Sequence, residues 1–487
     1  MTQPDQQPAV SGPEVDAVVV GAGPNGLAAA VAMAEAGLKV RVLEAAPRIG
    51  GGSRTEELTL PGFRHDVCSA IHPLALASPF FKSLPLEEHG VTWIHPPVLL
   101  AHPLEDGTAA LLERSIEGTA GSLGADARSY VRLMQPLAGA SEALVESFFG
   151  RPIPPPHPVA AALFGLKAIR SAAGLAEGRF AEDRARALLT GISGHALVPL
   201  TKPATASFGL MFSAIGHAWG WPLARGGSQA VVDALASYLG TMDGEVLVDR
   251  PVRSLSDLPG ARATLFDVTP RQLIDICGDR LPSTYRRRLE RFRYGPGVFK
   301  IDWALSDPVP WKAEGCTLAG TVHLGGRYDE IVESEAAIAA GRHPERPYMV
   351  TAQQSLFDPS RAPEGGHTFW GYCHVPNGSR VDMTERMERQ IERFAPGFRD
   401  VVVARHVMPP AALEAHDANY VGGDINGGAA DLRQLFTRPV ATLDPYSTPA
   451  DGIYICSSST PPGGGVHGMC GYLAARSALK HLGVKGC

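Results

Sequence analysis

Apolar runs alternate with glycine-rich turns near the start of the chain. Asp16–Val20 is a short run of β-branched residues, which is typical of a strand buried in a parallel sheet. Gly21–Gly26 follows at once, and Leu27–Ala36 is an alanine-rich stretch that favours a helix. Lys39–Leu43 predicts a second strand, and Glu44 stands directly after it. The order strand, G-x-G-x-x-G, helix, strand and acid predicts a dinucleotide-binding unit.

Each glycine of this motif has its own mechanical role. Gly21 makes the tight turn, Gly23 lets the backbone approach a pyrophosphate, and Gly26 lets the helix pack closely on the strand. The N-terminus of the helix offers free N–H groups and a positive dipole to phosphates. Glu44 lies 18 residues after Gly26, a spacing that suits a carboxylate accepting bonds from ribose hydroxyls.

The C-terminal end repeats the order strand, loop and helix. Gly452–Cys456 predicts a buried strand, Ser457–Gly468 a loop of small residues, and Met469–Leu482 a helix. The loop contains a second formal G-x-G-x-x-G. Only 19 residues follow it, which are too few for another strand–helix–strand unit, so we expect no second dinucleotide domain.

The middle of the chain carries further elements. Gln229–Leu239 predicts a helix, and Val246–Val252 and Ala263–Val268 predict strands. Tyr294–Leu305 alternates in a way that also indicates a strand. Ala206–Ala224 is a stretch of 19 uncharged residues, but it contains glycine, histidine and proline. We interpret it as an apolar wall inside the protein rather than a membrane span.

Composition narrows the class of protein. The chain has 487 residues, of which 45% are hydrophobic, so it can bury a large core and wholesale disorder is excluded. Glycine (54) and proline (41) are abundant, which indicates many turns and close backbone approaches. The net charge of −6 argues against nucleic acid as a partner.

Cysteine and histidine spacing argues against a metal centre. The seven cysteines are odd in number and show no CxxC spacing, and no histidine pair has the HExxH spacing. We therefore expect no metal and no disulfide framework, and a reducing cytoplasm as the location. Residues 1–14 are polar and proline-rich, which predicts a disordered tail rather than a signal peptide. Arg151–Pro158 predicts a stiff surface loop.

A second glycine-rich stretch carries a family resemblance. Arg48–Thr55 places three glycines and two arginines just beyond Glu44. Glu44 followed by Arg48-x-Gly-Gly resembles the extended motif of phytoene desaturase-like flavoproteins in the flavin-containing amine oxidase superfamily. Within it, the chain most resembles the branch named pyridine nucleotide-disulfide oxidoreductase domain-containing protein 2. Nicotinamide dehydrogenases do not usually show this motif, so FAD is favoured over NAD.

The same resemblance extends to other segments. The C-terminal loop resembles the family's final flavin motif, in which a helix N-terminus points at the flavin, and Val252 matches a valine that contacts the adenine. Motif and resemblance together predict these cofactor-binding residues: Gly21, Gly23, Pro24, Asn25, Gly26, Glu44, Ala45, Arg48, Gly51, Gly52, Ser53, Arg54, Val252, Ser458, Gly468 and Met469.

Four residues are candidates for catalysis. The strand that carries Lys300 resembles the amine oxidase strand whose lysine holds a water on flavin N5, and we carry that role over. The alternative is a strand-end lysine that reaches solvent. His323 and His374 are expected as cavity residues, although a buried, hydrogen-bonded histidine is the commoner case. His467 stands in the flavin motif where these desaturases usually have another residue.

The expected fold is α/β. A Rossmann-like, glutathione reductase-like FAD domain would be interleaved with a substrate domain made of a mixed sheet and helices. The expected FAD domain comprises residues 15–75, 225–289 and 440–487, and the expected substrate domain comprises residues 76–224 and 290–439.

The resemblance implies an FAD-dependent oxidoreductase. A hydride from a largely apolar small-molecule substrate would pass to flavin N5, giving C=C or C=N, and oxygen, a quinone or another carrier would take the electrons. The alternatives are a flavin amine oxidase and a non-redox FAD protein such as an isomerase or scaffold. The five arginines of Tyr285–Arg293 predict a solvated helix face, or else a patch for peripheral contact with anionic lipid headgroups.

Overall fold

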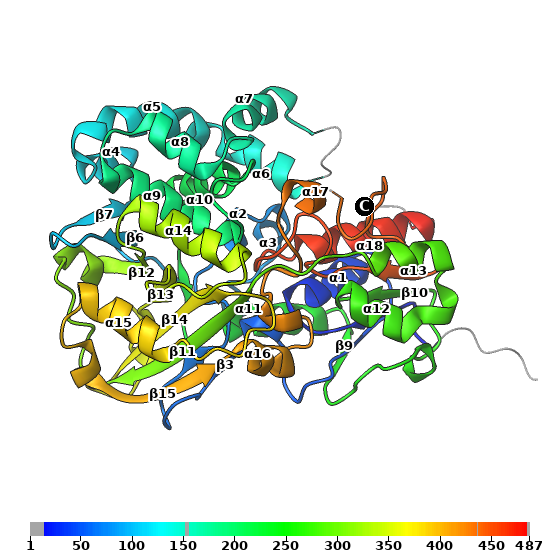
Figure 1. The fold of residues 1–487 in the computed structure, drawn as a ribbon. Coiled ribbons are helices and arrows are strands. Elements are labelled where there is room, and N and C mark those ends of the chain that lie inside the picture. The colour runs from blue at the N-terminus through cyan, green and yellow to red at the C-terminus, as the bar shows by residue number, and fades with distance from the viewer. Residues whose placement is uncertain (1–13, 151–154, 436, 485–487) are drawn as a thin grey trace, which may run out of the picture.

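The computed structural model describes residues 14–150, 155–435 and 437–484. The expected tail of residues 1–14 lies almost wholly outside these ranges, as does the first half of the expected loop at residues 151–158. Figure 1 shows two sheets side by side, with a layer of helices over the larger one.

A five-stranded parallel sheet forms the first half of the molecule. Its strands, in spatial order, are β16 (Ile453–Ile455), β10 (Ala263–Phe266), β1 (Ala17–Val20), β2 (Val40–Leu43) and β9 (Glu245–Leu247). The strands come from the start, the middle and the end of the chain. The four strands other than the exposed edge strand β9 are short, largely apolar and buried runs, which meet because they must be covered on both faces.

Both faces of this sheet are covered by helices. Ala17 and Val19 pack on the side of α1 (Pro24–Glu35), α11 (Gln229–Gly240) and α18 (Met469–His481). Val18 and Val20 point the other way, into a core shared with helices of the middle segment. Those helices are α12 (Pro270–Cys277) and α13 (Ser283–Leu289). The doubly covered parallel sheet confirms the expected Rossmann-like architecture.

A seven-stranded mixed sheet forms the second half. Its spatial order is β15 (Val402–Met408), β11 (Gly297–Leu305), β14 (His367–Val375), β13 (Met349–Ala352), β12 (Ala319–Leu324), β6 (Val98–Pro103) and β7 (Ala109–Leu112). Only β12 and β6 pair in parallel. Smaller pairs join β3 (Thr55–Glu56) to β4 (His65–Asp66) and β5 (Trp93–Ile94) to β8 (Leu223–Ala224).

Helices cover this sheet and extend beyond it. α15 (Thr384–Phe394) packs on the face that carries Phe299, Ile301 and Trp303. The remaining helices of this half are α4 (Ile116–Gly121), α5 (Ala127–Gly139), α6 (Ser141–Phe149), α7 (Pro158–Ala168), α8 (Ala172–Arg179), α9 (Asp183–Ser193), α10 (Ala206–Trp219), α14 (Tyr328–Ala339) and α16 (Pro410–His416). Short helices α2 (Pro73–Ala77), α3 (Pro79–Ser83) and α17 (Leu432–Leu435) lie near the meeting point of the two halves (Figure 1).

The strand predicted at Val246–Val252 and the arginine-rich helix are both shorter in the structure than expected. The strand expected at Val246–Val252 is only Glu245–Leu247 long. Beyond it the backbone N–H of Arg250 donates to the carbonyl oxygen of Glu44 at 2.8 Å, so the chain turns across the end of β2 instead of extending the sheet. The arginine-rich helix ends at Leu289 and exposes most of its arginines, which confirms the solvated face.

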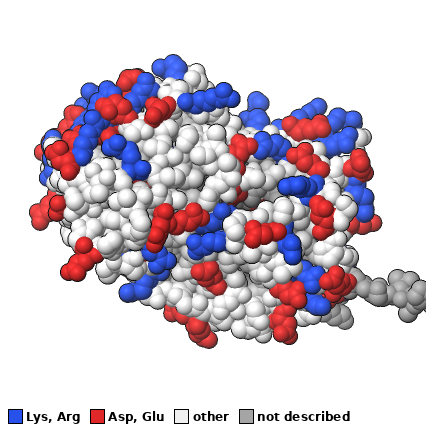
Figure 2. All heavy atoms as spheres, turned by 90° about the horizontal axis from the view of Figure 1, so that it is seen from below, with Lys and Arg blue, Asp and Glu red and all other residues white. Residues whose placement is uncertain are grey.

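Most of the uncharged stretch Ala206–Ala224 forms the largely buried helix α10, which ends at Trp219 and packs against α5 and α9. This confirms the apolar wall. Within the described part of the chain, no single helix is long and apolar enough to cross a membrane. Figure 2 shows one face of the molecule, on which acidic and basic side chains are interspersed rather than separated.

Candidate cofactor and substrate cavity

A cavity of about 810 Å³ lies between the two halves of the molecule. One end is walled by the loops at the carboxyl ends of β1, β2, β10 and β16, which is where ligands bind in open parallel sheets. The other end is walled by α10 and by the strands β12, β13 and β14. A single cavity therefore reaches both the glycine motifs and the apolar wall.

The first glycine motif has the geometry of a phosphate-binding turn. Gly21 has a φ of 103°, a conformation that favours glycine. A Cβ on Gly26 would lie 2.0 Å from the carbonyl oxygen of Gly21, so this position admits no side chain. α1 begins at Pro24, three residues earlier than expected, because proline at the first helical position needs no N–H partner. Gly23 and the open helix end thus face the cavity together.

Glu44 is held ready for a ligand at the end of β2. Its two carboxylate oxygens accept the backbone N–H groups of Ala22 at 2.8 Å and Ala46 at 2.9 Å. Each carboxylate oxygen has a second lone pair, so the group retains acceptor capacity towards the cavity that it lines. This arrangement fits the ribose-binding role that the spacing predicted.

Seven residues that line the cavity carry a buried polar atom with no hydrogen-bond partner among the described residues. Four of these atoms are Asn25 Oδ1, Ser53 Oγ, Arg54 Nε and Arg438 Nε, and the other three belong to His72, Thr321 and Trp370. Buried polar groups are nearly always satisfied in native proteins, so four on one wall indicate a missing polar ligand. Three of them belong to the predicted motifs, and the two guanidinium groups suit the charge of a diphosphate.

The same wall also carries two buried acids. Asp267, at the end of β10, accepts the Gly26 N–H at 2.9 Å. Burial and, less strongly, the nearby carboxylates of Asp417 and Glu44 together raise the pKa of Asp267 to about 8, although the bond from the Gly26 N–H lowers it. Burial also raises the pKa of Asp417. Asp267 therefore holds its proton at neutral pH, which makes it compatible with a neighbouring phosphate.

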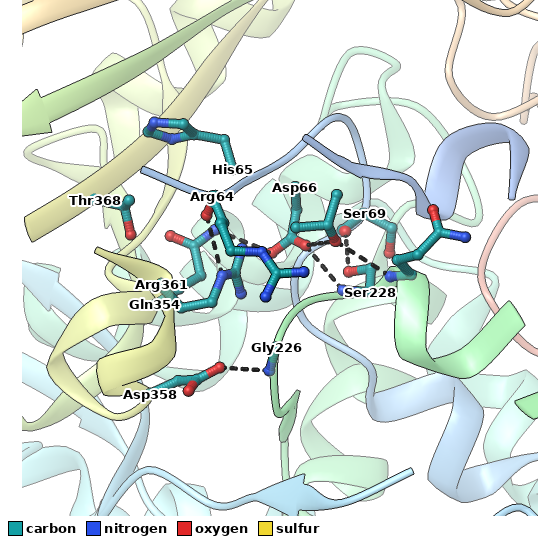
Figure 3. A network of polar contacts seen from close by, with 12 residues as sticks. Arg64, His65, Asp66, Ser69, Gly226, Ser228, Gln354, Asp358, Arg361 and Thr368 are labelled. Carbon is teal, nitrogen blue, oxygen red and sulfur yellow. Dashed lines mark hydrogen bonds and ion pairs between the residues drawn. The ribbon is translucent and has the colours of Figure 1, made fainter. Parts of the chain in front are cut away.

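A buried ion pair ties three distant segments together beneath the cavity. Asp66 on β4 accepts from the guanidinium of Arg361 at 2.8 Å, the Thr55 hydroxyl at 2.8 Å and the Ser228 N–H at 2.8 Å. Figure 3 shows Asp66 between Arg361 on one side and Ser228 on the other. Burial raises the pKa of Asp66, but the Arg361 charge and these bonds outweigh it and lower the pKa below its usual range.

This network positions part of the cavity wall. Ser228 also donates to the carbonyl oxygen of Ser69, and Ser69 lines the cavity. Figure 3 shows Gly226 donating to Asp358 in the same region. Segments from both halves of the molecule thus meet at one hydrogen-bonded cluster around Asp66, which rigidifies the junction between them.

Lys300 lies one layer behind the wall. Its side chain is 2% exposed and its ammonium is paired with Asp302, so the solvent-reaching alternative is wrong. The ammonium also lies 5.8 Å from the ring centre of Trp370, which lines the cavity. Burial raises the pKa of Asp302 to about 6 although the adjacent Lys300 lowers it. His65 lies 3.6 Å from the other carboxylate oxygen of Asp302.

The three candidate histidines do not line the cavity. His374 is buried and its Nδ1 lies 2.8 Å from Glu335, and the ring of His467 accepts the Met469 N–H at 3.0 Å. His323 is also buried, with Nε2 3.2 Å from Nε2 of His195. The expectation that His323 and His374 are cavity residues is therefore wrong. They share strand faces with the cavity-lining residues Thr321 and Tyr372, but they lie beyond the cavity, beside His195 and Glu335.

His195 is the histidine that sequence reasoning missed. It lies on a short 3₁₀ turn, Gly194–Ala196, between α9 and α10, and it lines the apolar end of the cavity. Burial lowers the pKa of His195 to about 4, so its ring is neutral at pH 7. Among the described residues, the hydrogen bond of the His195 ring joins its Nε2 to Nε2 of His323 and does not involve Nδ1. No motif surrounds it, which is why the sequence held no signal for it.

The apolar end of the cavity is built mainly by α10 and β14. Phe208, Met211 and Phe212 of α10 line it, and Trp370 and Tyr372 of β14 face it. The last two rings lie 5.3 Å apart in an edge-to-face arrangement. This end offers few polar partners, so it suits an apolar molecule.

Most of the predicted cofactor residues lie on the wall. Those that line it are Gly21, Gly23, Pro24, Asn25, Glu44, Ala45, Gly51, Gly52, Ser53, Arg54, Val252 and Ser458. Gly26 instead packs the helix on the strand, as its role required. Arg48 is exposed, and Gly468 and Met469 lie behind the loop at the start of α18, so these three lie off the wall.

The sequence search missed several wall residues besides His195. They are Asp267, Asp417, Tyr420 and Arg438. Asp417 and Tyr420 belong to the HDANYVGGDINGG segment at residues 416–428, whose glycines were a usable signal. A Cβ on Gly52 would lie 1.8 Å from the Tyr420 hydroxyl, which explains why that stretch needs glycine. Among the residues that the structure describes, no group of three His, Cys, Asp or Glu could hold a metal.

The class that the fold and cavity define agrees with comparisons to known proteins. Residues 19–83 match the family described as NAD(P)-binding Rossmann-like domain. Together with the doubly covered sheet, this places the chain among nucleotide-binding proteins of Rossmann type.

Individual proteins resemble this chain over almost its whole length, and so they say more about its class than the family match at residues 19–83 does. The chain is 28% identical to pyridine nucleotide-disulfide oxidoreductase domain-containing protein 2 of Mus musculus, over 96% of this chain and 94% of that protein. It is 26% identical to the neurosporene-forming phytoene desaturase of Rhodobacter capsulatus, over 93% of this chain and 92% of that protein. The structure of putrescine oxidase bound to putrescine has a TM-score of 0.62 at 18% identity, covering 96% of this chain and 99% of that one. The resemblance read from the motifs is confirmed, and these relatives are oxidoreductases.

Proposed function

We propose that this protein is an FAD-dependent oxidoreductase that acts on a largely apolar small molecule. The proposal rests chiefly on the four unpartnered polar atoms along one wall of a cavity whose other end is apolar. FAD would supply the redox chemistry when bound, by taking a hydride from a substrate C–H bond at its N5 and passing the electrons on to oxygen, a quinone or another carrier.

The residues of the chain would divide the binding of FAD among them. Glu44 would hold the ribose of the adenosine half, and the loop around Gly23 with the N-terminus of α1 would hold the diphosphate. Arg54 and Arg438 would add positive charge through the guanidinium nitrogens that lack partners. Val252 would lie against the adenine end of the cavity.

The apolar end of the cavity would bind the substrate and exclude water. Phe208, Met211 and Phe212 of α10 form one side, and Trp370 and Tyr372 form another. Exclusion of water strengthens every electrostatic interaction at the reacting centre and protects reactive products. No charged side chain is needed here for an apolar substrate, which agrees with the uncharged sequence of this helix.

His195 would accept the proton that oxidation releases. Forming C=C or C=N removes a hydride and also a proton, so a base must lie beside the substrate. The His195 ring lines the apolar end, is neutral at pH 7, and pairs with His323 through Nε2 rather than Nδ1. Nδ1 is therefore the atom that would take the proton, and His323 would orient the ring.

Spectroscopy on the purified protein tests the proposal. The protein should be yellow and should release FAD on denaturation, and the flavin band should bleach when candidate apolar substrates are added without oxygen. Gly23→Val should lose the cofactor, because a side chain there occupies the approach to the diphosphate. A colourless wild type that does not bind added FAD would refute the proposal.

A second candidate is an amine oxidase. Two aromatic rings, Trp370 and Tyr372, face the cavity, and such faces attract amines through cation–π contacts. Bleaching by primary or secondary amines but not by hydrocarbons would favour this candidate. A flavin that no substrate bleaches while turnover still occurs would indicate a non-redox role.

A further inference from the structure

α7 is an apolar helix that the protein leaves uncovered. Of its eleven residues, Pro158–Ala168, only Ala168 is buried. Val159 is 73% exposed, Leu163 57% and Leu166 74%, and Ile169 just beyond is 51% exposed. Large apolar side chains clustered at this exposure mark an interaction site in a folded protein.

The exposed side chains share one face of the helix. Val159, Leu163 and Leu166 follow the spacing i, i+4, i+7, which places them on one side. The opposite side contacts α6 and α10. Figure 1 shows α7 at the upper edge of the molecule, beyond α10 and next to α6. The apolar face is therefore directed away from the body of the protein.

The two helices on which α7 packs, α6 and α10, both line the cavity. α10 lines the cavity through Phe208 and Met211, and α6 does so through Phe148, which is also 40% exposed to solvent. The two helices that carry α7 are thus the ones that wall the apolar end.

The charges beside the face are positive. Lys167 lies in the last turn of α7 and Arg170 directly after it, and residues 158–176 contain no Asp or Glu. Lys202 is exposed nearby, since Ala204 donates to the carbonyl oxygen of Ile169 at 2.9 Å. The nearest acid at the other end, Glu146, is paired with His157 at 2.5 Å. Cations beside an apolar helix face complement anionic headgroups.

The dimensions of α7 favour a bilayer surface over a second copy of the chain. At about 1.5 Å per residue the helix is about 16 Å long, too short for a hydrocarbon core of about 30 Å. Its face covers roughly 16 by 10 Å, or about 160 Å², against about 800 Å² per partner in a stable protein interface. α7 and α8 do form a bent apolar pair, at 86°, but α8 is largely buried.

We propose that α7 docks in the plane of an anionic lipid bilayer, with Val159, Leu163, Leu166 and Ile169 in the acyl boundary and Lys167 and Arg170 at the headgroups. The docking site is distinct from the arginine-rich segment at residues 285–293. The docking itself does not rest on the proposed function.

Vesicle flotation of the full chain tests the docking. Wild type should float with vesicles of phosphatidylcholine containing about one quarter phosphatidylglycerol, and less with pure phosphatidylcholine. Leu163→Asp should lower the bound fraction at least about tenfold, because one buried leucine contributes that much or more. Val403→Asp is the matched control, since Val403 is 55% exposed on the edge strand β15, and its binding should stay at the wild-type level.

Each contrary result has a defined meaning. Absence of flotation by wild type, or equal flotation by Leu163→Asp with an unchanged melting temperature, would overturn the proposal. Equal binding to neutral and anionic vesicles would overturn the role of Lys167 and Arg170. A dimer that Leu163→Asp converts to a monomer would assign the face to a second copy. Flotation needs no turnover, so its failure would leave the oxidoreductase proposal standing.

Discussion

Asp267→Asn removes the acid that contacts the phosphate-binding turn at Gly26. Its carboxyl oxygen accepts the Gly26 N–H, and a Cβ on Gly23 would lie 3.1 Å from the same oxygen. A diphosphate bound there would lie beside this group. Burial, with help from Asp417 and Glu44, raises the pKa of Asp267 to about 8. A bound diphosphate adds negative charge and would raise this pKa further.

The expected size follows from linkage between proton and ligand binding. If FAD binds only the protein with neutral Asp267, affinity follows the protonated fraction, which is about 0.9 at pH 7 and about 0.1 at pH 9. Wild type should therefore bind FAD about tenfold more weakly at pH 9 than at pH 7. Asp267→Asn keeps the acceptor for Gly26 and cannot ionise, so its affinity should stay level over that range.

The free energy of unfolding of the apoprotein should also fall as pH rises, as the affinity for FAD does. The pKa of Asp267 rises from 3.8 to about 8 on folding, so the unfolded chain loses this proton first. Folding is then progressively destabilised as pH rises from about 4 to about 8, and Asp267→Asn should remove that part of the loss.

Equilibrium dialysis of FAD against apoprotein, from pH 6 to about pH 9, measures the effect. Asp275→Asn is the control, because Asp275 also lines the cavity but makes no contact with the glycine turn. A pH slope that survives in Asp267→Asn, or a wild-type affinity that does not change between pH 7 and 9, would refute the reasoning.

Three other substitutions test the rest of the site. Glu44→Ala should weaken FAD binding at least about tenfold in the same dialysis, because it removes charge-assisted acceptors for ribose hydroxyls, and unchanged affinity would contradict that role. His195→Gln should keep FAD but slow anaerobic flavin reduction about 10²- to 10⁴-fold in stopped flow, and wild-type rates would exclude it as the base. Lys300→Met should destabilise the fold by about 3–5 kcal/mol in urea unfolding, because buried Asp302 loses its partner. Adding Asp302→Asn should restore most of that stability while flavin reduction stays at least about tenfold slow, and a normal rate would assign Lys300 to structure.

Local sequence determined the cofactor half. The order of Ala17–Val20, Gly21–Gly26 and Val40–Leu43 follows from propensities and glycine geometry that act over a few residues. Glu44 could be predicted because its distance along the chain from Gly26 sets its place in space. The small residues around Ser458 were predicted instead from the resemblance of the C-terminal loop, and they meet the first motif across β10, the strand that lies between β1 and β16.

Tertiary structure alone decided the rest. Lys300 and Asp302 stand two residues apart on one face of β11, but the burial of this pair, away from solvent and off the cavity wall, depended on both faces of β11 being covered. His374 contacts Glu335 rather than the cavity. His195 has no motif around it, but the turn between α9 and α10 places it at the apolar end of the cavity. Arg438 and Asp267 are 171 residues apart and share one wall. Sequence pattern records which residues a short segment buries, but contacts between distant segments are set by how whole elements pack, and no local periodicity encodes that packing.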